Sequence, residues 1–312
     1  MIEDITKDAA TREMAITQIS GSGCFIGIPI MDKNENVYGT LCAMDSDPYQ
    51  FTDEHIRILK SLTSILSYVV ELENAEKKMS TELAKAKAIQ KSVLSPKMDD
   101  EHIQIEGVYY PTHYLSGDMY SWYKIDSSRY GIMLIDVMGH GVSASLISMA
   151  LRSLMTNLIL KVIDPVDVCK ELNKQLYKLL PSKIISYATG IYLVIDTKLK
   201  TIEYVNTGHP PGLLKLDGDL VDIEPTSTAI GLIEAPEISK KTFSYQKDID
   251  ILLYTDGLLE LDGEKSLQKN VTKLSSLFIN QNISIFDWIE TQIIEKSTEF
   301  PDDISIVRVK TK

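Results

Sequence analysis

Short strand-like runs joined by tight turns fill residues 100–312, and this pattern restricts the fold more than any other feature of the sequence. Each run is apolar or alternates apolar and polar residues, and turn residues separate the runs. The links DSSR, TKLK and DG are short enough for hairpins, so we expect antiparallel pairing. The runs are 103–112, 119–125, 130–136, 189–196, 201–208, 212–218, 248–256 and 304–310.

Four segments of the same region have the apolar spacing of helices. They are 142–161, 165–180, roughly 265–279 and 284–297. Each sheet and each helix must bury its apolar face against another layer, and helices grouped between sets of antiparallel strands are typical of α+β proteins. We therefore predict an α+β domain, an antiparallel β-sandwich flanked by helices.

The first part of the chain predicts a smaller α/β segment that leads into a long helix. Residues 24–32 and 38–46 alternate like strands around the polar turn KNEN. A helical pattern begins near Thr52 and continues to about residue 94. Residues 56–71 of this helix are rich in apolar side chains, so we expect them to pack on a sheet.

The second half of this helix, residues 72–93, is charged and contains a weak heptad. Leu72, Met79 and Ala86 are seven residues apart, which is the spacing of a helix that pairs with another helix. A homodimer through this helix is one interpretation, and a solitary solvated linker helix is the other. Pro96 ends the pattern because proline cannot continue a helix.

Composition and charge narrow the class of protein. A chain of 312 residues, with 44% hydrophobic and 24% charged residues, is ordinary for a soluble protein of about two domains. The net charge of −12 argues against nucleic acid and anionic membranes as partners. No apolar run reaches the roughly 18–20 residues of a membrane span, and the acidic start is unlike a secretory signal. Three widely separated cysteines predict reduced thiols and a cytoplasmic location.

Aspartates stand where several of the predicted strands begin or end. Asp118 and Asp136 would face each other across the DSSR hairpin, and Asp256 ends another apolar run. Asp302 and Asp303 come directly before the last strand. Because the start of one antiparallel strand and the end of its neighbour share an edge, carboxylates from separate segments can converge there. A single strand-end aspartate is more often a turn or cap residue, but like charges gathered at one edge need compensation.

Carboxylates without an accompanying cysteine or histidine cluster suit hard cations such as Mg²⁺ or Mn²⁺ rather than zinc. Two ions that share a carboxylate would lie roughly 3.5–4 Å apart and hold one water between them. Such a water loses a proton readily and attacks phosphorus in line, while the ions offset charge on the phosphoryl oxygens. Neighbouring glycines allow backbone carbonyls and waters to approach closely. The pattern thus indicates phosphate-ester chemistry with two metal ions.

Seven segments, in this order, resemble the PPM family of metal-dependent serine/threonine protein phosphatases, most closely its SpoIIE-like branch, which controls sigma-factor partner switching. The segments are SGDMYSW (116–122), IDVMGHGVSAS (135–145), ATGIYLVID (188–196), YVNTGHPPGLL (204–214), AIGL (229–232), LLYTDGLLE (252–260) and PDDISIV (301–307). The fold that this resemblance implies, a two-sheet sandwich flanked by paired helices, agrees with the pattern of strands and helices.

The resemblance also implies a role for each aspartate. Asp118 and Asp136 would be metal ligands, with Asp136 shared by two Mn²⁺ or Mg²⁺ ions and the backbone carbonyl of Val137 as a further ligand. Asp256 and Asp302 would complete the set, and all four aspartates would act in catalysis through metal-bound water. Directly behind the ligands would lie Asp303, Gly139 and Gly257.

The substrate that the resemblance implies is a phosphoserine or phosphothreonine on a regulatory protein, an anti-sigma-factor antagonist. The alternative is a non-catalytic module that uses the same fold to bind a phosphoprotein or a sigma-factor regulator. The complete aspartate set argues against this alternative.

Residues 1–75 resemble the second half of a GAF sensor domain, on IEDITKDAA, FIGIPIMDKNENVYGTLCAMD and FTDEHIRILKSLTSILSYVVE. We expect a partial sensor or dimerisation segment here, a helical linker at 76–99 and a phosphatase domain at 100–312. Within the linker, AIQKSVLSP (88–96) resembles a switch element. As a hypothesis, this element positions the helices at 142–180 so that the second metal ion is engaged.

Two histidines, His140 and His209, follow glycine and are candidates for a catalytic acid. Neutral histidines in such turns more often bond to backbone groups, so we expect both to have scaffold roles.

Overall fold

The computed structural model describes residues 1–312 except 14, 21, 181–184, 262–265, 280–284 and 296–300. It contains two compact units, Met1–Glu82 and Leu83–Lys312, and the chain passes from one to the other within the helix α2 (Asp53–Ser92). The expected segment limits at 75 and 99 stay predictions.

One hairpin forms the centre of the first unit. Its strands β1 (Cys24–Met31) and β2 (Val37–Asp45) pair antiparallel, as their alternating pattern predicts. Asp32 shapes the turn, because its side chain accepts a 2.9 Å hydrogen bond from the backbone amide of Asn36. The short helix α1 (Ala15–Ser20) precedes the hairpin.

The apolar half of α2 differs from the expectation. Among residues 56–71, all of which the structure describes, Thr63 alone is buried. Ser67 accepts a hydrogen bond from the amide of Met31 in the hairpin. A two-stranded sheet can cover only a narrow stripe of a helix, so the prediction that 56–71 pack on a sheet is wrong for most of its apolar side chains. The exposed ones are Ile58, Leu62, Ile65, Leu66, Tyr68 and Val69.

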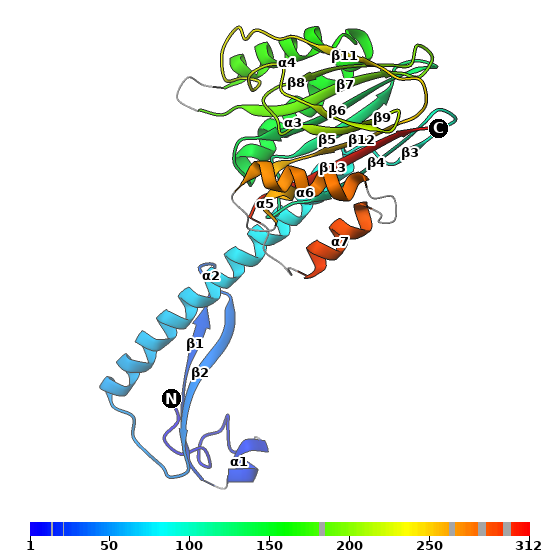
Figure 1. The fold of residues 1–312 in the computed structure, drawn as a ribbon. Coiled ribbons are helices and arrows are strands. Elements are labelled where there is room, and N and C mark those ends of the chain that lie inside the picture. The colour runs from blue at the N-terminus through cyan, green and yellow to red at the C-terminus, as the bar shows by residue number, and fades with distance from the viewer. Residues whose placement is uncertain (14, 21, 181–184, 262–265, 280–284, 296–300) are drawn as a thin grey trace. The chain divides into compact units, whose positions relative to one another are not determined.

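Two antiparallel sheets form the second unit (Figure 1). The six-stranded sheet has the order β10-β9-β12-β13-β4-β3, and the five-stranded sheet has the order β11-β8-β7-β6-β5. The strands are β3 (Met98–Asp99), β4 (Ile103–Tyr110), β5 (Met119–Lys124), β6 (Arg129–Val137), β7 (Ala188–Asp196), β8 (Thr201–Asn206), β9 (Gly212–Leu216), β10 (Asp219–Ile223), β11 (Lys241–Ser244), β12 (Ile249–Tyr254) and β13 (Ile304–Thr311).

Helices cover the outer face of each sheet, so the second unit has four layers (Figure 1). α3 (Val142–Lys161) and α4 (Pro165–Leu179) pack on the five-stranded sheet. α5 (Asp256–Glu260), α6 (Leu267–Ile279) and α7 (Ile285–Glu295) lie over the six-stranded sheet and share a buried apolar cluster with it. A third cluster fills the space between the sheets. The predicted antiparallel α+β sandwich flanked by helices is confirmed.

Local sequence explains most of these elements. The links DSSR, TKLK and DG join β5 to β6, β7 to β8 and β9 to β10, and each pair is antiparallel as predicted. Asp164 caps α4 by accepting from the amides of Val166 and Asp167. The prediction missed β3, β10, β11, α1 and α5, which are short. The predicted helix ends at 265, 284 and 297 lie outside the described residues.

Within the described part of the chain, one helix, α3, is long and apolar enough to cross a membrane by length and composition. It packs one side on β5 and β6, where Leu151, Met155 and Ile159 are buried. A core helix of a sandwich passes the same test, so this finding does not point to a membrane.

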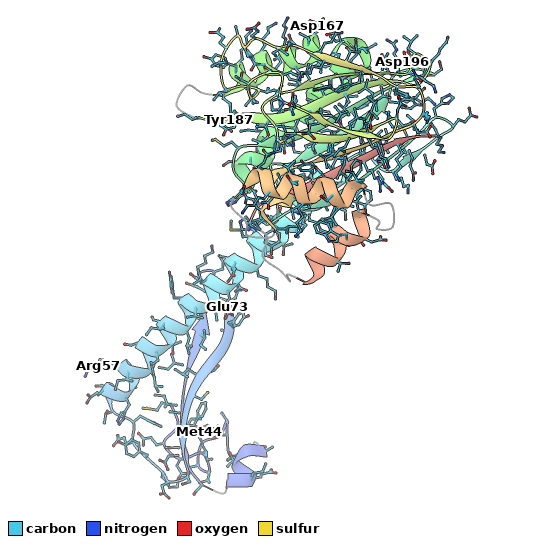
Figure 2. All side chains as sticks on the ribbon, viewed as in Figure 1. Met44, Arg57, Glu73, Asp167, Tyr187 and Asp196 are labelled. Carbon is cyan, nitrogen blue, oxygen red and sulfur yellow. The ribbon has the colours of Figure 1, made fainter. Side chains whose placement is uncertain are left out.

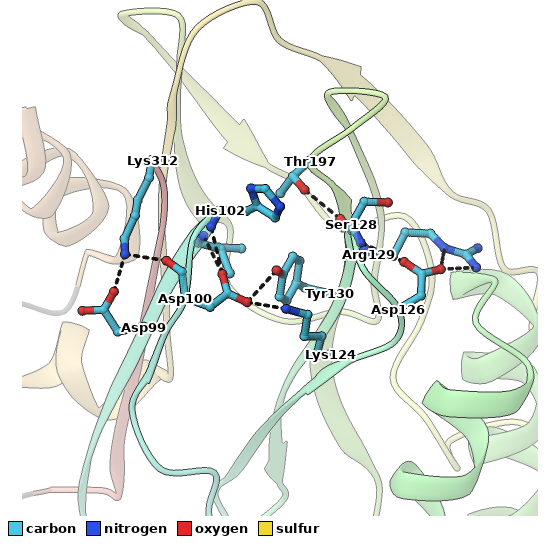
Figure 3. Close-up of polar contacts among 11 residues, drawn as sticks. Asp99, Asp100, His102, Lys124, Asp126, Ser128, Arg129, Tyr130, Thr197 and Lys312 are labelled. Carbon is cyan, nitrogen blue, oxygen red and sulfur yellow. Dashed lines mark hydrogen bonds and ion pairs between the residues drawn. The ribbon is translucent and has the colours of Figure 1, made fainter.

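A polar cluster closes one end of the sandwich, near the C-terminus (Figure 3). The carboxylate of Asp100 accepts hydrogen bonds from the Tyr130 hydroxyl at 2.7 Å and the Lys124 ammonium at 2.9 Å. Lys312 pairs with Asp99 and donates to the carbonyl oxygen of Asp100. Partial burial raises the pKa of Asp100, but the hydrogen bonds from Tyr130 and Lys124 outweigh this effect. The pKa of Asp100 is therefore well below its ordinary value.

Candidate active site

The hairpin of β5 and β6 brings Asp118 and Asp136 to one edge of the five-stranded sheet. Met119 pairs with Ile135, so the two aspartates lie one position further out on neighbouring strands. Asp136 in turn pairs with Thr189 of β7. This juxtaposition follows the prediction made from the DSSR turn.

The six-stranded sheet supplies the other aspartates. Asp256 begins α5 directly after β12, and Asp302 and Asp303 precede β13, the strand that pairs with β12. A Cβ at Gly257 would lie 2.2 Å from the carbonyl oxygen of Asp303, so only glycine allows the two segments to approach this closely.

A cavity of about 870 Å³ lies between these edges, and Asp136, Asp256 and Asp302 line it. Gly139 and Tyr187 belong to its wall, and Figure 2 labels Tyr187. Three aspartates from separate strand ends therefore share one solvent-accessible space. Asp118 and Asp303 are buried behind it.

Burial and mutual repulsion disfavour the charged form of these carboxyl groups. Burial and then the charges of Asp256 and Asp302 raise the pKa of Asp136 to about 8. Burial and the charge of Asp302 raise the pKa of Asp256 to about 6. The pKa of Asp118 is raised by burial and by Asp136. The ionised form of each of these carboxyl groups is therefore disfavoured by burial and by the neighbouring carboxylates.

The donor set fits a hard cation. Among the described residues, no lysine or arginine forms an ion pair with any of the five aspartates. Within the same residues, no three acidic, histidine or cysteine side chains converge tightly enough to hold one ion alone. An ion here would take further oxygen ligands from water or backbone carbonyls, which is the usual manner of Mg²⁺. The predicted metal roles stay predictions.

Asp302 and Asp303 are adjacent but point to different partners. Asp303 accepts hydrogen bonds from the backbone amides of Thr112 at 2.8 Å and Gly117 at 2.9 Å. Asp302 lines the cavity and accepts from the amide of Asp303. Asp303 thus holds the loop that carries Asp118, while Asp302 faces the solvent-accessible space.

Backbone carbonyls also approach this loop. A Cβ at Gly117 would lie 2.7 Å from the carbonyl oxygen of Val137 and 3.0 Å from that of Gly139. Gly139 has φ +83°, a conformation that L side chains rarely adopt. The glycines therefore let the turn after β6 fold over the Asp118 loop.

Three supporting residues escaped the sequence prediction. The Thr255 hydroxyl donates to Asp118 at 2.8 Å, Thr189 is the cross-strand partner of Asp136, and Gln90 bonds to Ser116 in the SGD segment. Thr255 precedes Asp256 in the segment YTDG. This position beside a predicted ligand is the one feature of the sequence that could have indicated a role for Thr255 in the site. Nothing local to Thr189 or Gln90 identifies its distant partner.

The two histidines have different surroundings. His209 is buried, and its Nε2 bonds to the backbone carbonyl of Tyr254, as expected for a scaffold residue. His140 is exposed and its ring lies 4.8 Å from that of His113. Both exposed rings lie near Asp302, whose pKa is raised chiefly by burial and is lowered in part by their charge.

A two-sheet sandwich with flanking helices and an aspartate cluster at one edge defines a phosphatase fold of the PPM class. The family model described as Stage II sporulation protein E (SpoIIE) matches residues 126–312, and the chain therefore belongs to the SpoIIE family of PPM phosphatase domains. The model described as GAF domain matches residues 2–70.

Known proteins of similar sequence or fold are consistent with this family assignment. Phosphoserine phosphatase RsbP from Bacillus subtilis is 42% identical over 182 residues, which are 57% of this chain and 45% of that protein. The chain thus spans about half the length of this relative. The SiaA-PP2C domain of Pseudomonas aeruginosa superposes with a TM-score of 0.62 at 20% identity, over 75% of this chain and 97% of that one. RsbX in complex with magnesium has a TM-score of 0.52 at 17% identity, over 70% and 99%. The two structural likenesses show the fold alone.

Proposed function

We propose that this chain is a divalent-metal-dependent protein serine/threonine phosphatase. One observation carries the proposal: Asp136, Asp256 and Asp302 arrive from three strand ends at one cavity, with Asp118 buried behind them. The similarity to RsbP, a phosphoserine phosphatase, supports hydrolysis of a phosphate ester. The magnesium in the RsbX structure supports a divalent cation as cofactor.

The proposed ligands are Asp118, Asp136, Asp256, Asp302 and the carbonyl oxygen of Val137. When bound, Mn²⁺ or Mg²⁺ ions would acidify a water and offset the charge of the phosphoryl group. The chain's own residues prepare this site, because Thr255 orients Asp118 and Asp303 fixes the loop before it. The crowding that raises the carboxyl pKa values is relieved when cations bind.

The proposed substrate is a phosphoserine or phosphothreonine on a regulatory protein, of the anti-sigma-factor antagonist type. The relation to RsbP supports this class. A cavity of about 870 Å³ at the sandwich edge has room for a phosphorylated side chain with neighbouring residues. The net charge of −12 also disfavours nucleic acid as the phosphate source. We place the chain in the cytoplasm, where its three free cysteines would stay reduced.

A homodimer through α2 is the proposed assembly. Ile58, Ile65, Leu72 and Met79 are seven residues apart and are 52–64% exposed. Leu62 and Val69, exposed as well, fill the alternate positions of the same heptad. An apolar stripe of this length on a solvent-facing helix is typical of a coiled-coil seam, and a second copy would cover it.

The test is Mn²⁺-dependent hydrolysis of p-nitrophenyl phosphate and of a phosphoserine protein by the metal-stripped chain. Wild type should gain activity with Mn²⁺, and Asp136→Asn should lose at least about 100-fold because a ligand charge is gone. Asp219→Asn, an exposed aspartate on β10, is the matched control and should match wild type. Binding of the phosphoprotein without turnover by wild type would favour the non-catalytic module.

A further inference from the structure

A buried histidine ties the two sheets together beside the aspartates. His209, in the turn after β8, is 1% exposed. Its Nε2 lies 2.9 Å from the carbonyl oxygen of Tyr254, and its Nδ1 lies 2.8 Å from the hydroxyl of Thr189. Tyr254 ends β12 of the six-stranded sheet, while Thr189 belongs to β7 of the five-stranded sheet. The imidazole therefore bridges the two sheets.

The partners determine which ring nitrogen carries the proton. A carbonyl oxygen can only accept, so Nε2 holds the proton and donates it to Tyr254. Nδ1 is then unprotonated and accepts from the hydroxyl of Thr189. Burial lowers the pKa of His209 to about 4, so the ring is neutral at neutral pH. The bridge adds no charge beside the carboxylates.

Other hydrogen bonds hold the turn that carries this histidine. The Asn206 side chain accepts from the His209 amide at 2.8 Å and donates to the His209 carbonyl at 3.1 Å. The hydroxyl of Tyr254 donates to the carbonyl of Pro211 at 2.6 Å. The segment 206–211 and the end of β12 therefore bind each other in both directions.

Each end of the bridge lies next to an aspartate of the cluster. Thr189 is the cross-strand partner of Asp136, and Tyr254 precedes Asp256 by two residues. Asp136 and Asp256 repel each other when both are ionised. The bridge joins β12 to β7, and β7 is hydrogen-bonded to β6 at Asp136. It therefore resists the separation that this repulsion favours.

We propose that His209 is a positioning residue that sets the separation of Asp136 and Asp256 and, through it, the affinity of the cluster for divalent cations. The inference rests on the proposed function. It assigns a structural role to the segment NTGHPP (206–211). It assigns no proton transfer to His209.

The experiment measures Mn²⁺ binding to the metal-stripped full chain by isothermal titration calorimetry. Parallel assays with p-nitrophenyl phosphate give kcat and KM at saturating Mn²⁺, and thermal melts report folding. Thr189→Val removes one hydrogen bond at constant shape. His209→Leu removes both ring bonds, and His209→Gln keeps one donor and one acceptor. The control, Tyr130→Phe, loses a hydrogen bond at the other end of β6.

We expect Thr189→Val and His209→Leu to weaken Mn²⁺ binding by about 10-fold or more, as loss of outer partners of metal ligands does. At saturating Mn²⁺, the fold-decrease in kcat should be smaller than the fold-decrease in Mn²⁺ affinity. His209→Gln should have most of the wild-type Mn²⁺ affinity. Tyr130→Phe should lower the melting temperature and leave Mn²⁺ affinity unchanged.

Wild-type affinity in Thr189→Val and His209→Leu would overturn the inference, as would an equal loss in Tyr130→Phe. If His209→Leu does not fold, Thr189→Val decides. Failure of the proposed function would give a different result. Either wild type would bind no Mn²⁺, or Asp136→Asn would bind Mn²⁺ as tightly as wild type does. Both proposals would then be overturned.

Discussion

The side-chain amide of Gln90 holds the backbone of Ser116 from both sides. Its Nε2 donates to the Ser116 carbonyl at 2.7 Å, and its Oε1 accepts from the Ser116 amide at 3.1 Å. Gln90 is buried near the end of α2, and Ser116 precedes Asp118 by two residues. The segment 88–96, expected to act as a switch, is thus bonded directly to the loop of a proposed ligand, and its switching role stays a prediction.

Gln90→Leu should destabilise the second unit by about 1–3 kcal/mol, because it removes the acceptor of the buried Ser116 amide and of the Tyr109 hydroxyl. The Ser116 carbonyl would keep only the longer hydrogen bond from the Ser148 hydroxyl. Urea denaturation measures this change. Lys91→Leu, at the neighbouring exposed position, is the control and should change stability little. Equal stability of Gln90→Leu and wild type would contradict the role assigned to these hydrogen bonds.

Asp302→Asn should affect Mn²⁺ binding, whereas Asp303→Asn should affect the stability of the fold. Asp303→Asn replaces one of two oxygens that accept backbone amides, so it should lower the free energy of unfolding by about 1–3 kcal/mol. Asp302→Asn should leave stability near wild type and weaken Mn²⁺ binding, since Asp302 lines the cavity. Melting curves and calorimetry separate the two, and the reverse pattern would exchange their roles.

Metal removal should expose the repulsion among the carboxylates. In EDTA at neutral pH, Asp136→Asn should be more stable than wild type by about 1–2 kcal/mol, because asparagine needs no proton to enter a site where burial and Asp256 disfavour the ionised carboxylate. Mn²⁺ should raise the melting temperature of wild type and barely change that of the variant. Scanning fluorimetry with and without Mn²⁺ checks both statements. A destabilised Asp136→Asn in EDTA would show that the repulsion is not significant.

Met79→Glu should dissociate the proposed α2 dimer, because it buries a charge in the apolar seam. Light scattering after size-exclusion chromatography should show a dimeric wild type and a monomeric variant. Lys78→Glu changes a neighbouring exposed position outside the apolar seam, and this variant should remain dimeric. A monomeric wild type at micromolar concentration would favour the solitary linker helix.

Stability should fall on acidification partly through Asp100. Its pKa in the folded chain is below the ordinary value of 3.8, so the ionised carboxylate stabilises the fold above about pH 4. This contribution is lost as the pH falls through the folded pKa. Asp100→Asn should therefore be less stable than wild type at pH 7, and the difference should shrink toward pH 2. Urea denaturation at several pH values measures it, and a constant difference would contradict the assignment.

Local pattern determined much of this protein. Alternation, helical spacing and the turns DSSR, TKLK and DG act over a few residues, so they predict strands, helices and hairpins, and the hairpin register already placed Asp118 opposite Asp136. The resemblance of seven segments to the PPM family then indicated which aspartates to examine.

Only the tertiary structure decided which side chains support that edge. Asp303 reaches Gly117 across 186 residues of chain, and Thr255 reaches Asp118 across 137. Such contacts depend on how two sheets dock, which is the sum of many weak packing terms that no short segment encodes. The exposure of the apolar stripe on α2 has the same origin, because helical spacing specifies an apolar face but not the area of sheet available to cover it.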